Sequence, residues 1–226
     1  MNMSLNDTSK KLAVVFDMDG VLIDSTYYIW ESFRQLLAPY GVEVTDDLIK
    51  ECLGYSLETQ IKIWEERFKI KLPPLPEFSE KAAEIEIAMM KESMVKQDLI
   101  TFLEELKKNK FRLAVGTASQ RRRAIQILDL LGVKDYFDAI ITANDVTEHK
   151  PNPHVYLEAA KKINVEPKSC VVIEDASAGI EAARRAKMKS VGYITKYSSA
   201  ESLKDANLLI KGFDELSVEK LEELLA

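Results

Sequence analysis

Four groups of residues, far apart in the sequence, carry side chains that could together transfer a phosphoryl group. They are a pair of carboxylates, a hydroxyl-bearing turn, a lysine before a proline and a second acidic pair: Asp17 and Asp19, Thr117-Ala118-Ser119, Lys150, and Glu174-Asp175. One carboxylate can attack phosphorus and form an aspartyl-phosphate. Another can protonate the leaving oxygen and then activate water for the second step. Taken singly, most of these residues have an ordinary interpretation as a helix cap or a solvated surface group. Glu174 is the exception, because an acid directly after a buried run needs a partner. The combination is therefore what indicates chemistry.

The other residue types suit the remaining tasks of such a reaction. A hydroxyl and a backbone N–H at a helix N-terminus can hold phosphoryl oxygens, and the turn Thr117-Ala118-Ser119 precedes an expected helix. The Lys150 ammonium can neutralise charge on the nucleophile and on the transferring group. The remaining carboxylates suit a hard divalent ion, and Mg²⁺ binds such oxygen ligands together with a substrate phosphate. An acidic pair after a buried strand also requires a cation or a proton to neutralise it.

Short apolar runs that are typical of buried strands alternate with helical patterns along most of the chain. The expected strands are 12–16, 113–116, 139–142, 170–173, 191–194 and 208–210, and the expected helices among them are 100–109, 122–131, 153–163 and 178–186. This alternation predicts an α/β fold with a doubly wound parallel sheet and right-handed crossovers. In such a sheet the four groups gather at one rim, because ligands bind at the carboxyl ends of parallel strands.

One long interval interrupts this alternation. Between the first and second expected strands the sequence holds only amphipathic helical patterns, at 28–37, 47–53, 57–68 and 80–94, with a proline-rich loop at 72–76. A connection of this length is better explained as an inserted helical domain than as a loop. We therefore expect a helical domain at 26–96, inserted into a core that is formed by 1–25 and 97–226.

The bulk composition narrows the class of protein. The 226 residues suffice for one core and a smaller appended domain, and the net charge of −6 argues against nucleic acid or an anionic membrane as a partner. Cys52 and Cys170 have no metal-ligand spacing and fit a reducing compartment. The polar N-terminal segment has no apolar signal region, so we expect a cytoplasmic protein, as a monomer or weak dimer.

Together the four groups resemble the four motifs of the haloacid dehalogenase superfamily. The matching segments are Asp17-Met18-Asp19-Gly20-Val21-Leu22-Ile23-Asp24-Ser25, Gly116-Thr117-Ala118-Ser119, Lys150-Pro151-Asn152-Pro153 and Ile173-Glu174-Asp175-Ala176-Ser177-Ala178-Gly179-Ile180. The resemblance extends over nearly the whole chain and points to the β-phosphoglucomutase and phosphoglycolate phosphatase branch. It implies a Rossmann-like core with an inserted four-helix cap domain.

The resemblance also implies a catalytic role for each matching residue. Asp17 would be the nucleophile, and Asp19 would be the general acid and base. Thr117 and the amide of Ala118 would hold the phosphate. Lys150 would bridge Asp17 and the phosphate.

A metal site follows from the same resemblance. Mg²⁺ would be bound by Asp17, the carbonyl of Asp19 and Asp175, with Glu174 as a ligand or its near support. Ser119 is a further candidate for contact with the phosphate.

The motifs leave a choice of reaction within the superfamily. Asp19 argues against dehalogenation, because the dehalogenases have no aspartate two residues after the nucleophile. Leu57 and Ile29 stand where the mutases carry a phosphate-binding arginine and a hinge histidine, which favours a phosphatase acting on a small-metabolite phosphomonoester such as a sugar or polyol phosphate. The alternative is a β-phosphoglucomutase-like isomerase, for which Lys81 is a candidate cap lysine. A phosphoryl-aspartate receiver is a third class, which the helical insert disfavours.

Three further polar residues near these motifs keep two interpretations each. Arg121 either attracts an anionic substrate or is an ordinary surface residue. His149 either touches the substrate or lies in a solvated loop. His154 is better explained as a residue at a helix start than as a metal ligand.

Overall fold

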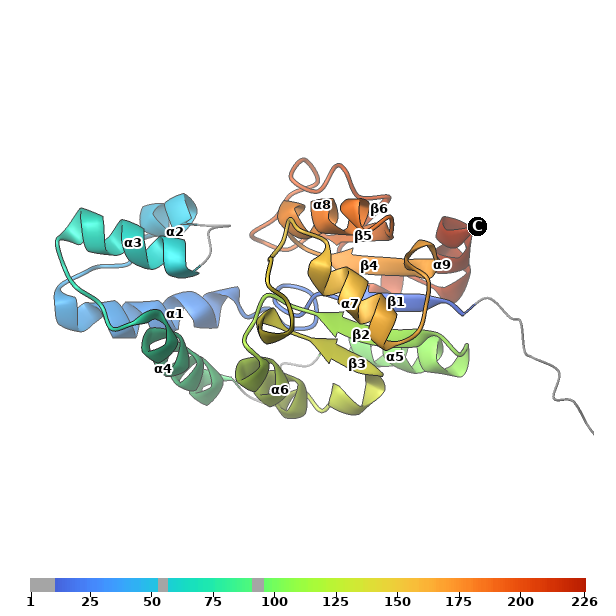
Figure 1. Ribbon diagram of the computed structural model, residues 1–226, viewed down its shortest axis with the longest axis horizontal. Coiled ribbons are helices and arrows are strands. Elements are labelled where there is room, and N and C mark those ends of the chain that lie inside the picture. The colour runs from blue at the N-terminus through green and yellow to red at the C-terminus, as the bar shows by residue number, and fades with distance from the viewer. Residues whose placement is uncertain (1–10, 53–56, 91–95) are drawn as a thin grey trace, which may run out of the picture.

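A six-stranded parallel sheet forms the core of the protein in the computed structural model, which describes residues 11–52, 57–90 and 96–226 (Figure 1). The strand order is β3-β2-β1-β4-β5-β6. In chain order the strands are β1 (Ala13–Phe16), β2 (Arg112–Gly116), β3 (Ala139–Ile141), β4 (Cys170–Glu174), β5 (Lys189–Tyr193) and β6 (Leu208–Ile210). The chain leaves the central β1 in one direction for β2 and β3 and in the other for β4 to β6. β1 therefore lies at the switch point where α/β sheets bind ligands.

The strand register aligns the residues that carry the candidate chemistry. Phe16 at the end of β1 lies opposite Val115 of β2 and Ile173 of β4. The residues that follow these three therefore emerge at the same level of the sheet. β1 is fully buried, which is why its sequence is apolar at every position instead of alternating.

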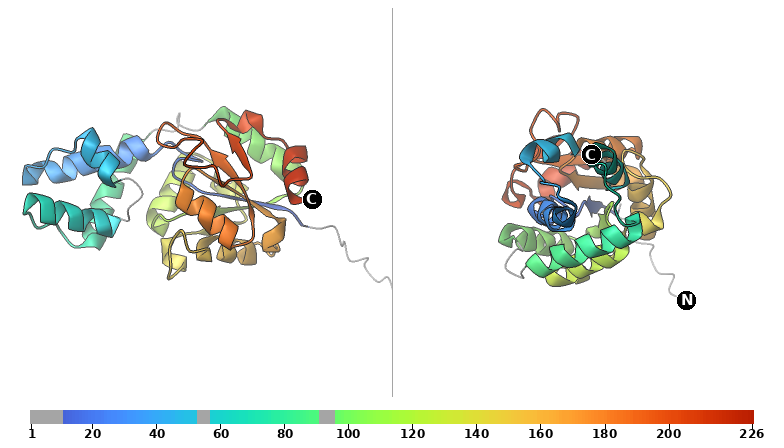
Figure 2. Two further views of the ribbon diagram at one scale, coloured as in Figure 1. Left: turned by 90° about the horizontal axis from the view of Figure 1, so that it is seen from above. Right: turned by 90° about the vertical axis from the view of Figure 1, so that its left-hand side faces the viewer.

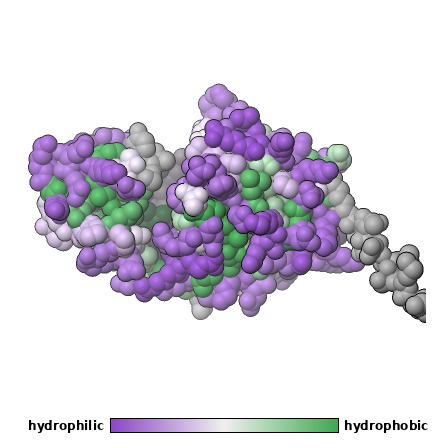
Figure 3. Space-filling model, viewed as in Figure 1, coloured by the Kyte–Doolittle hydropathy of each residue, from purple (hydrophilic) through white to green (hydrophobic). Residues whose placement is uncertain are grey.

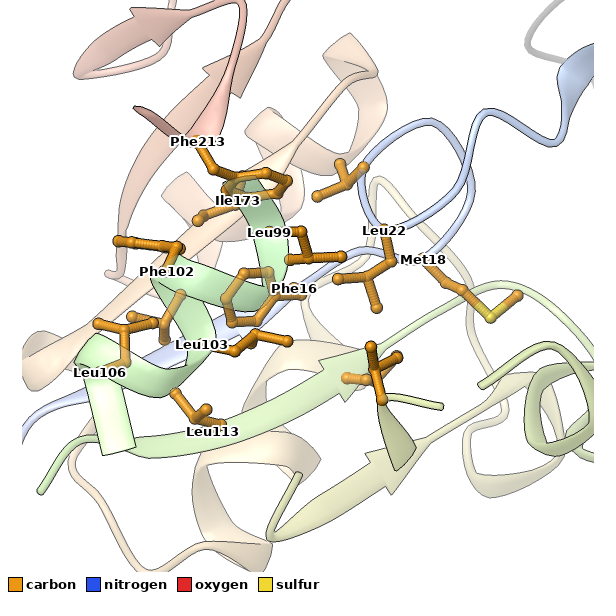
Figure 4. Close-up of a cluster of buried hydrophobic side chains, with 14 of the residues drawn as sticks. Phe16, Met18, Leu22, Leu99, Phe102, Leu103, Leu106, Leu113, Ile173 and Phe213 are labelled. Atoms are coloured by element: carbon orange, nitrogen blue, oxygen red, sulfur yellow. The ribbon is translucent and has the colours of Figure 1, made fainter. Parts of the chain in front are cut away.

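Helices cover both faces of the sheet. On one face, a cluster of buried hydrophobic side chains that includes Val14 and Phe16 joins the sheet to α5 (Gln97–Lys108), α6 (Arg121–Leu130) and α9 (Val218–Leu225), as Figure 4 shows in part. The cluster around Ala13 and Val15 packs against α7 (His154–Lys162) and α8 (Ser177–Arg185). Successive residues of β1 thus point to opposite faces. Single turns of 3₁₀ helix lie at Ala38–Tyr40, Lys134–Tyr136, Ala143–Asp145, Pro167–Ser169 and Phe213–Glu215.

The helices α1 (Thr26–Leu37), α2 (Asp46–Cys52), α3 (Leu57–Phe68) and α4 (Leu75–Met89) form a second lobe, which we call the cap lobe (Figures 1 and 2). It has a hydrophobic cluster of its own, separate from those of the sheet. Phe33 lies at its centre, with ring centroids 5.4 Å from Trp30, 5.3 Å from Trp64 and 5.9 Å from Phe78. The surface of both lobes is mainly hydrophilic in the view of Figure 3.

The Rossmann-like sheet and the inserted helices confirm the predicted fold class. Most expected boundaries lie within about three residues of the observed ones, but those of α4 were wrong. This helix ends at Met89, before the expected 94, and it begins at Leu75, inside the expected proline-rich loop. Pro76 stands in its first turn, where a missing N–H breaks no helical bond. The C-terminal helix α9 was not predicted. The expected helix ends at 53 and 94 lie outside the described residues. The domain limits at 26–96 stay a prediction.

No helix in the described ranges is long and apolar enough to cross a membrane.

We expect Phe33→Ala to lower the free energy of unfolding of the cap lobe by about 3–5 kcal/mol, because it opens a cavity among three aromatic rings. Both tryptophans of the chain, Trp30 and Trp64, lie in this cluster. Tryptophan fluorescence in a urea titration therefore reports on the cap lobe. The control is Tyr40→Ala, at an exposed aromatic residue of the same lobe, with an expected change within about 0.5 kcal/mol. Equal effects of the two substitutions would contradict the assignment of this cluster.

Candidate active site

Three of the candidate segments meet where the central strands end. Asp17 follows β1, Thr117 follows β2 and Glu174 is the last residue of β4. Backbone bonds continue the sheet into this edge: the N–H of Asp17 donates to the carbonyl of Ile173 at 2.9 Å, and the N–H of Thr117 donates to the carbonyl of Ile141 at 3.0 Å. All three side chains are buried. The sheet therefore fixes the positions of these polar groups.

Lys150 joins the carboxylates of two strands. Its Nζ lies 2.6 Å from Asp17 Oδ1 and 2.7 Å from Glu174 Oε1, and 4.8 Å from the centre of the Tyr156 ring. Burial lowers the pKa of Lys150, but the charges of Asp17 and Glu174 outweigh it and hold this pKa well above its usual value. The lysine is therefore a permanent cation between two acids.

The carboxyl group of Asp17 has an unusual affinity for a proton. Burial raises its pKa, Lys150 opposes this, and the negative charges of Glu174 and Asp19 raise it further, to about 7. The single lysine is thus not enough to neutralise the acids of this rim.

Three carboxylates at the rim fit a hard divalent cation. Asp17, Glu174 and Asp175 each offer an oxygen, and these oxygens lie within 4.8 Å of one another. Burial raises the pKa of Asp175, and the charges of Glu174 and Asp17 add to this, to about 9. Gly20, at φ +85°, leaves room for Asp175, whose Oδ2 would lie 1.9 Å from a Cβ at that position. An oxygen-lined, electron-rich cluster of this kind suits Mg²⁺.

Glu174 differs from Asp17 and Asp175 because hydrogen-bond donors of the protein already contact both of its carboxylate oxygens. Its Oε1 accepts hydrogen bonds from Lys150 and from the Tyr156 hydroxyl at 3.0 Å, and its Oε2 accepts one from the N–H of Ala176 at 2.8 Å. These bonds favour its role as a support for Lys150 and for the metal ligands.

Asp19 is held by four donors. Its Oδ1 accepts from Ser25 Oγ at 2.5 Å and from Arg123 Nη2 at 2.7 Å, and its Oδ2 accepts from Ser119 Oγ at 2.7 Å and from Arg123 Nη1 at 2.8 Å. Burial raises the pKa of Asp19, but Arg123 and the two hydroxyls outweigh it and hold this pKa below its usual value. Asp19 is therefore ionised in this arrangement.

The turn after β2 brings its hydroxyls to different partners. Thr117 Oγ1 accepts from the N–H of Ser119 at 3.0 Å, while the Ser119 hydroxyl donates to Asp19. Ala118 between them is exposed. The turn leads into α6, whose first residue is Arg121.

A protein-family model described as "Haloacid dehalogenase-like hydrolase" matches residues 14–193. The chain belongs to this family. A phosphorylated carbohydrates phosphatase of Thermotoga maritima is 32% identical over 214 residues, which are 94% of this chain and 96% of the relative. A fructose-1-phosphate phosphatase of Escherichia coli is 32% identical over 79% of this chain and 94% of its own length.

The solved structure of a β-phosphoglucomutase from Clostridium difficile has the same fold as this haloacid dehalogenase-like hydrolase. Its TM-score is 0.82 at 29% identity, over 95% of this chain and 97% of that one. The predicted family, and the prediction of a phosphoric monoester hydrolase of the haloacid dehalogenase type, are confirmed.

Some of the candidates in this haloacid dehalogenase-like hydrolase are exposed or pair with other surface residues. Lys81 pairs with Glu77 at 2.8 Å on an exposed part of α4, which does not support a place in the cleft. Arg121 pairs with Asp145 at 2.6 Å and is half exposed. His149 is exposed in a loop, and His154 is the first residue of α7.

The two residues that the sequence analysis compared with the mutases lie among apolar neighbours. Ile29 and Leu57 pack against the hydrophobic cluster of the cap lobe. The loop residues 53–56 lie outside the described residues.

The structure adds three residues that the sequence did not single out: Tyr156, Arg123 and Glu86. The Tyr156 hydroxyl orients Glu174, and the Arg123 guanidinium lies between Asp19 and the buried Glu86 of α4. Glu86 does have a signal in the sequence, because it stands four residues after Ala82 and eight after Phe78, on the buried stripe of its helix. A lone acid on such a stripe needs a partner.

We expect Mg²⁺ to raise the melting temperature more strongly as the pH rises from about 6 to 9. Without metal, the raised pKa values of Asp17 and Asp175 keep protons on the folded protein, and this contribution to stability is lost as the pH passes about 7 and 9. Because Mg²⁺ must displace those protons, its apparent affinity rises with pH, by about tenfold per unit for each proton displaced.

Thermal melts with Mg²⁺ or EDTA over this pH range measure the effect. Asp175→Asn should abolish the Mg²⁺ shift, whereas Asp205→Asn, at an exposed acid, should keep it. A shift that is independent of pH, or that survives in Asp175→Asn, would argue against this metal site.

We expect Gly179→Ala to lower kcat for an activated phosphoester by roughly 10- to 100-fold. A Cβ at Gly179 would lie 1.7 Å from Glu174 Oε1, so Glu174 must move and release Lys150. The melting temperature should also fall, although alanine favours a helix over glycine by about 1 kcal/mol. Ser177→Ala, at an exposed position of the same helix, is the control. A more stable variant with unchanged kcat would refute the packing of Gly179 on Glu174.

Proposed function

We propose that the protein is a Mg²⁺-dependent phosphatase that hydrolyses a small-metabolite phosphomonoester, of the sugar or polyol phosphate class, through an aspartyl-phosphate. The observation that carries this proposal is the arrangement of Asp17 and Asp19. The Asp17 carboxylate is buried against Lys150, and the Asp19 carboxylate is held in place by four hydrogen-bond donor atoms. The phosphatases among the relatives support the substrate class.

In the first step, an oxygen of Asp17 attacks phosphorus, and the bond from phosphorus to the leaving-group oxygen breaks. Lys150 holds Asp17 and neutralises negative charge as the phosphoryl group arrives. Asp19 is ionised in the arrangement described above, so it must take up a proton before this step; it then gives that proton to the leaving oxygen, so that a neutral alcohol departs. We place the phosphoryl oxygens against the Thr117 hydroxyl and the Ala118 amide, with Ser119 beside them.

In the second step, water attacks the phosphorus of the aspartyl-phosphate and the bond to Asp17 breaks. Asp19, now ionised, takes the proton from the attacking water, and inorganic phosphate leaves. Both steps thus use the same two aspartates.

A Mg²⁺ ion would be held by Asp17, Asp175 and the Asp19 carbonyl, with Glu174 as a ligand or its near support. When bound, it would draw charge from the phosphoryl oxygens and relieve the repulsion among these acids.

We place the cap domain at 26–96, where it can close over the substrate and exclude water from the first step. A cytoplasmic location and a monomer or weak dimer stay predictions.

The decisive experiment is product analysis with a panel of phosphoesters that includes sorbitol 6-phosphate, fructose 1-phosphate and β-glucose 1-phosphate. We expect free phosphate in the presence of Mg²⁺ and none with chelator. Asp17→Asn should abolish release while leaving the circular dichroism spectrum unchanged, because it removes the nucleophile. Conversion of β-glucose 1-phosphate to glucose 6-phosphate with little free phosphate would establish the mutase instead.

A further inference from the structure

Helices α4 and α6 face each other across the boundary of the two lobes, beside Asp19 (Figure 1). Arg123 of α6 contacts Asp19 through two nitrogens, and it also contacts both carboxylate oxygens of Glu86 on α4, with Nε lying 2.7 Å from Oε2. The side chain of Glu86 is only 3% exposed, and that of Arg123 is 11% exposed. The Arg123 guanidinium of the core is therefore shared by Asp19 of the core and Glu86 of the cap lobe.

The other cations of these two helices are also paired. Arg121 lies against Asp145, Arg122 against Glu84 of α4 at 3.4 Å, and Lys81 against Glu77. Together with the contacts of Arg123, these pairs account for every lysine and arginine of α4 and α6. The group of Asp19, Arg123 and Glu86 carries one positive and two negative charges when both acids are ionised. Burial raises the pKa of Glu86, and the hydrogen bonds and charge of Arg123 oppose this rise. The contact of Arg123 with both oxygens of Glu86 is the geometry of a charge-assisted pair.

We infer that Glu86 is a specificity-determining residue that selects substrates with a neutral leaving group and rejects those with a second anionic group. This inference rests on the proposed function, in which Asp19 protonates the leaving oxygen and the leaving group therefore lies beside Asp19. Arg123 would attract a second anion at that place, but Glu86 cancels its charge. Because both groups are buried, solvent screens this effect little.

The proposal separates two chemical classes of substrate. A sugar or polyol monophosphate offers hydroxyl groups to this region, and these can accept from Arg123 or donate to Glu86. A bisphosphate or a phosphorylated sugar acid brings a negative charge toward the Glu86 carboxylate, and toward Asp19 as well once Asp19 has given up its proton. Buried like charges repel strongly, so the second class is disfavoured.

The test compares sorbitol 6-phosphate with 6-phosphogluconate, two open-chain substrates that differ only in a terminal hydroxymethyl group against a carboxylate. We expect the wild-type protein to favour sorbitol 6-phosphate by about tenfold or more in kcat/KM. Glu86→Gln removes the negative charge and should reduce this preference by about tenfold, through a larger kcat/KM for 6-phosphogluconate. Glu86→Asp, which keeps the charge, should retain the preference.

Glu84→Gln is the matched control, because Glu84 lies on the same helix and also pairs with an arginine of α6, but at an exposed position. It should leave the ratio unchanged. Three results would overturn the assignment of Glu86. The first is equal kcat/KM of the wild-type protein for the two substrates, and the second is a parallel loss of kcat/KM for both substrates in Glu86→Gln. The third is a change of the ratio in Glu84→Gln as large as that in Glu86→Gln. The absence of phosphate release from any substrate of the panel would instead overturn the proposed phosphatase activity.

Discussion

Repulsion among buried carboxylates is the constraint on which this active site depends. Asp17, Glu174 and Asp175 cluster at the sheet edge. Burial and the neighbouring negative charges raise the pKa values of Asp17 and Asp175. The Lys150 ammonium relieves part of this repulsion by bridging two of the acids. The repulsion that remains is of the kind that a divalent cation relieves.

The backbone makes this crowding possible in two ways. The parallel register places the ends of β1, β2 and β4 side by side, so acids that are far apart in sequence converge without long loops. Gly20 and Gly179 provide space where a Cβ would collide with Asp175 and Glu174. The site therefore depends on the absence of two side chains as much as on the presence of the acids.

The sheet, its rim and most of the candidate residues could be predicted from the sequence, because each strand is a short apolar run that leads directly to its polar residues. Lys150 was the hardest of these to predict, since it follows no strand directly. Arg123 and Glu86 were missed because their pairing arises only when α4 packs beside α6, and no local pattern encodes that approach. The start of α4 was misplaced because the prolines were interpreted as a loop, although a first helical turn accepts them.

The separate hydrophobic cluster of the cap lobe has an evolutionary consequence. The chain passes from the sheet into this lobe after β1 and returns before α5, and the lobe packs on its own interior. Substitutions in that interior can accumulate without disturbing β1, β2 and β4, whose ends hold the acidic rim. The lobe can thus behave as an exchangeable module, and grafting it between relatives offers a direct route to enzymes with the same chemistry and a different choice of metabolite.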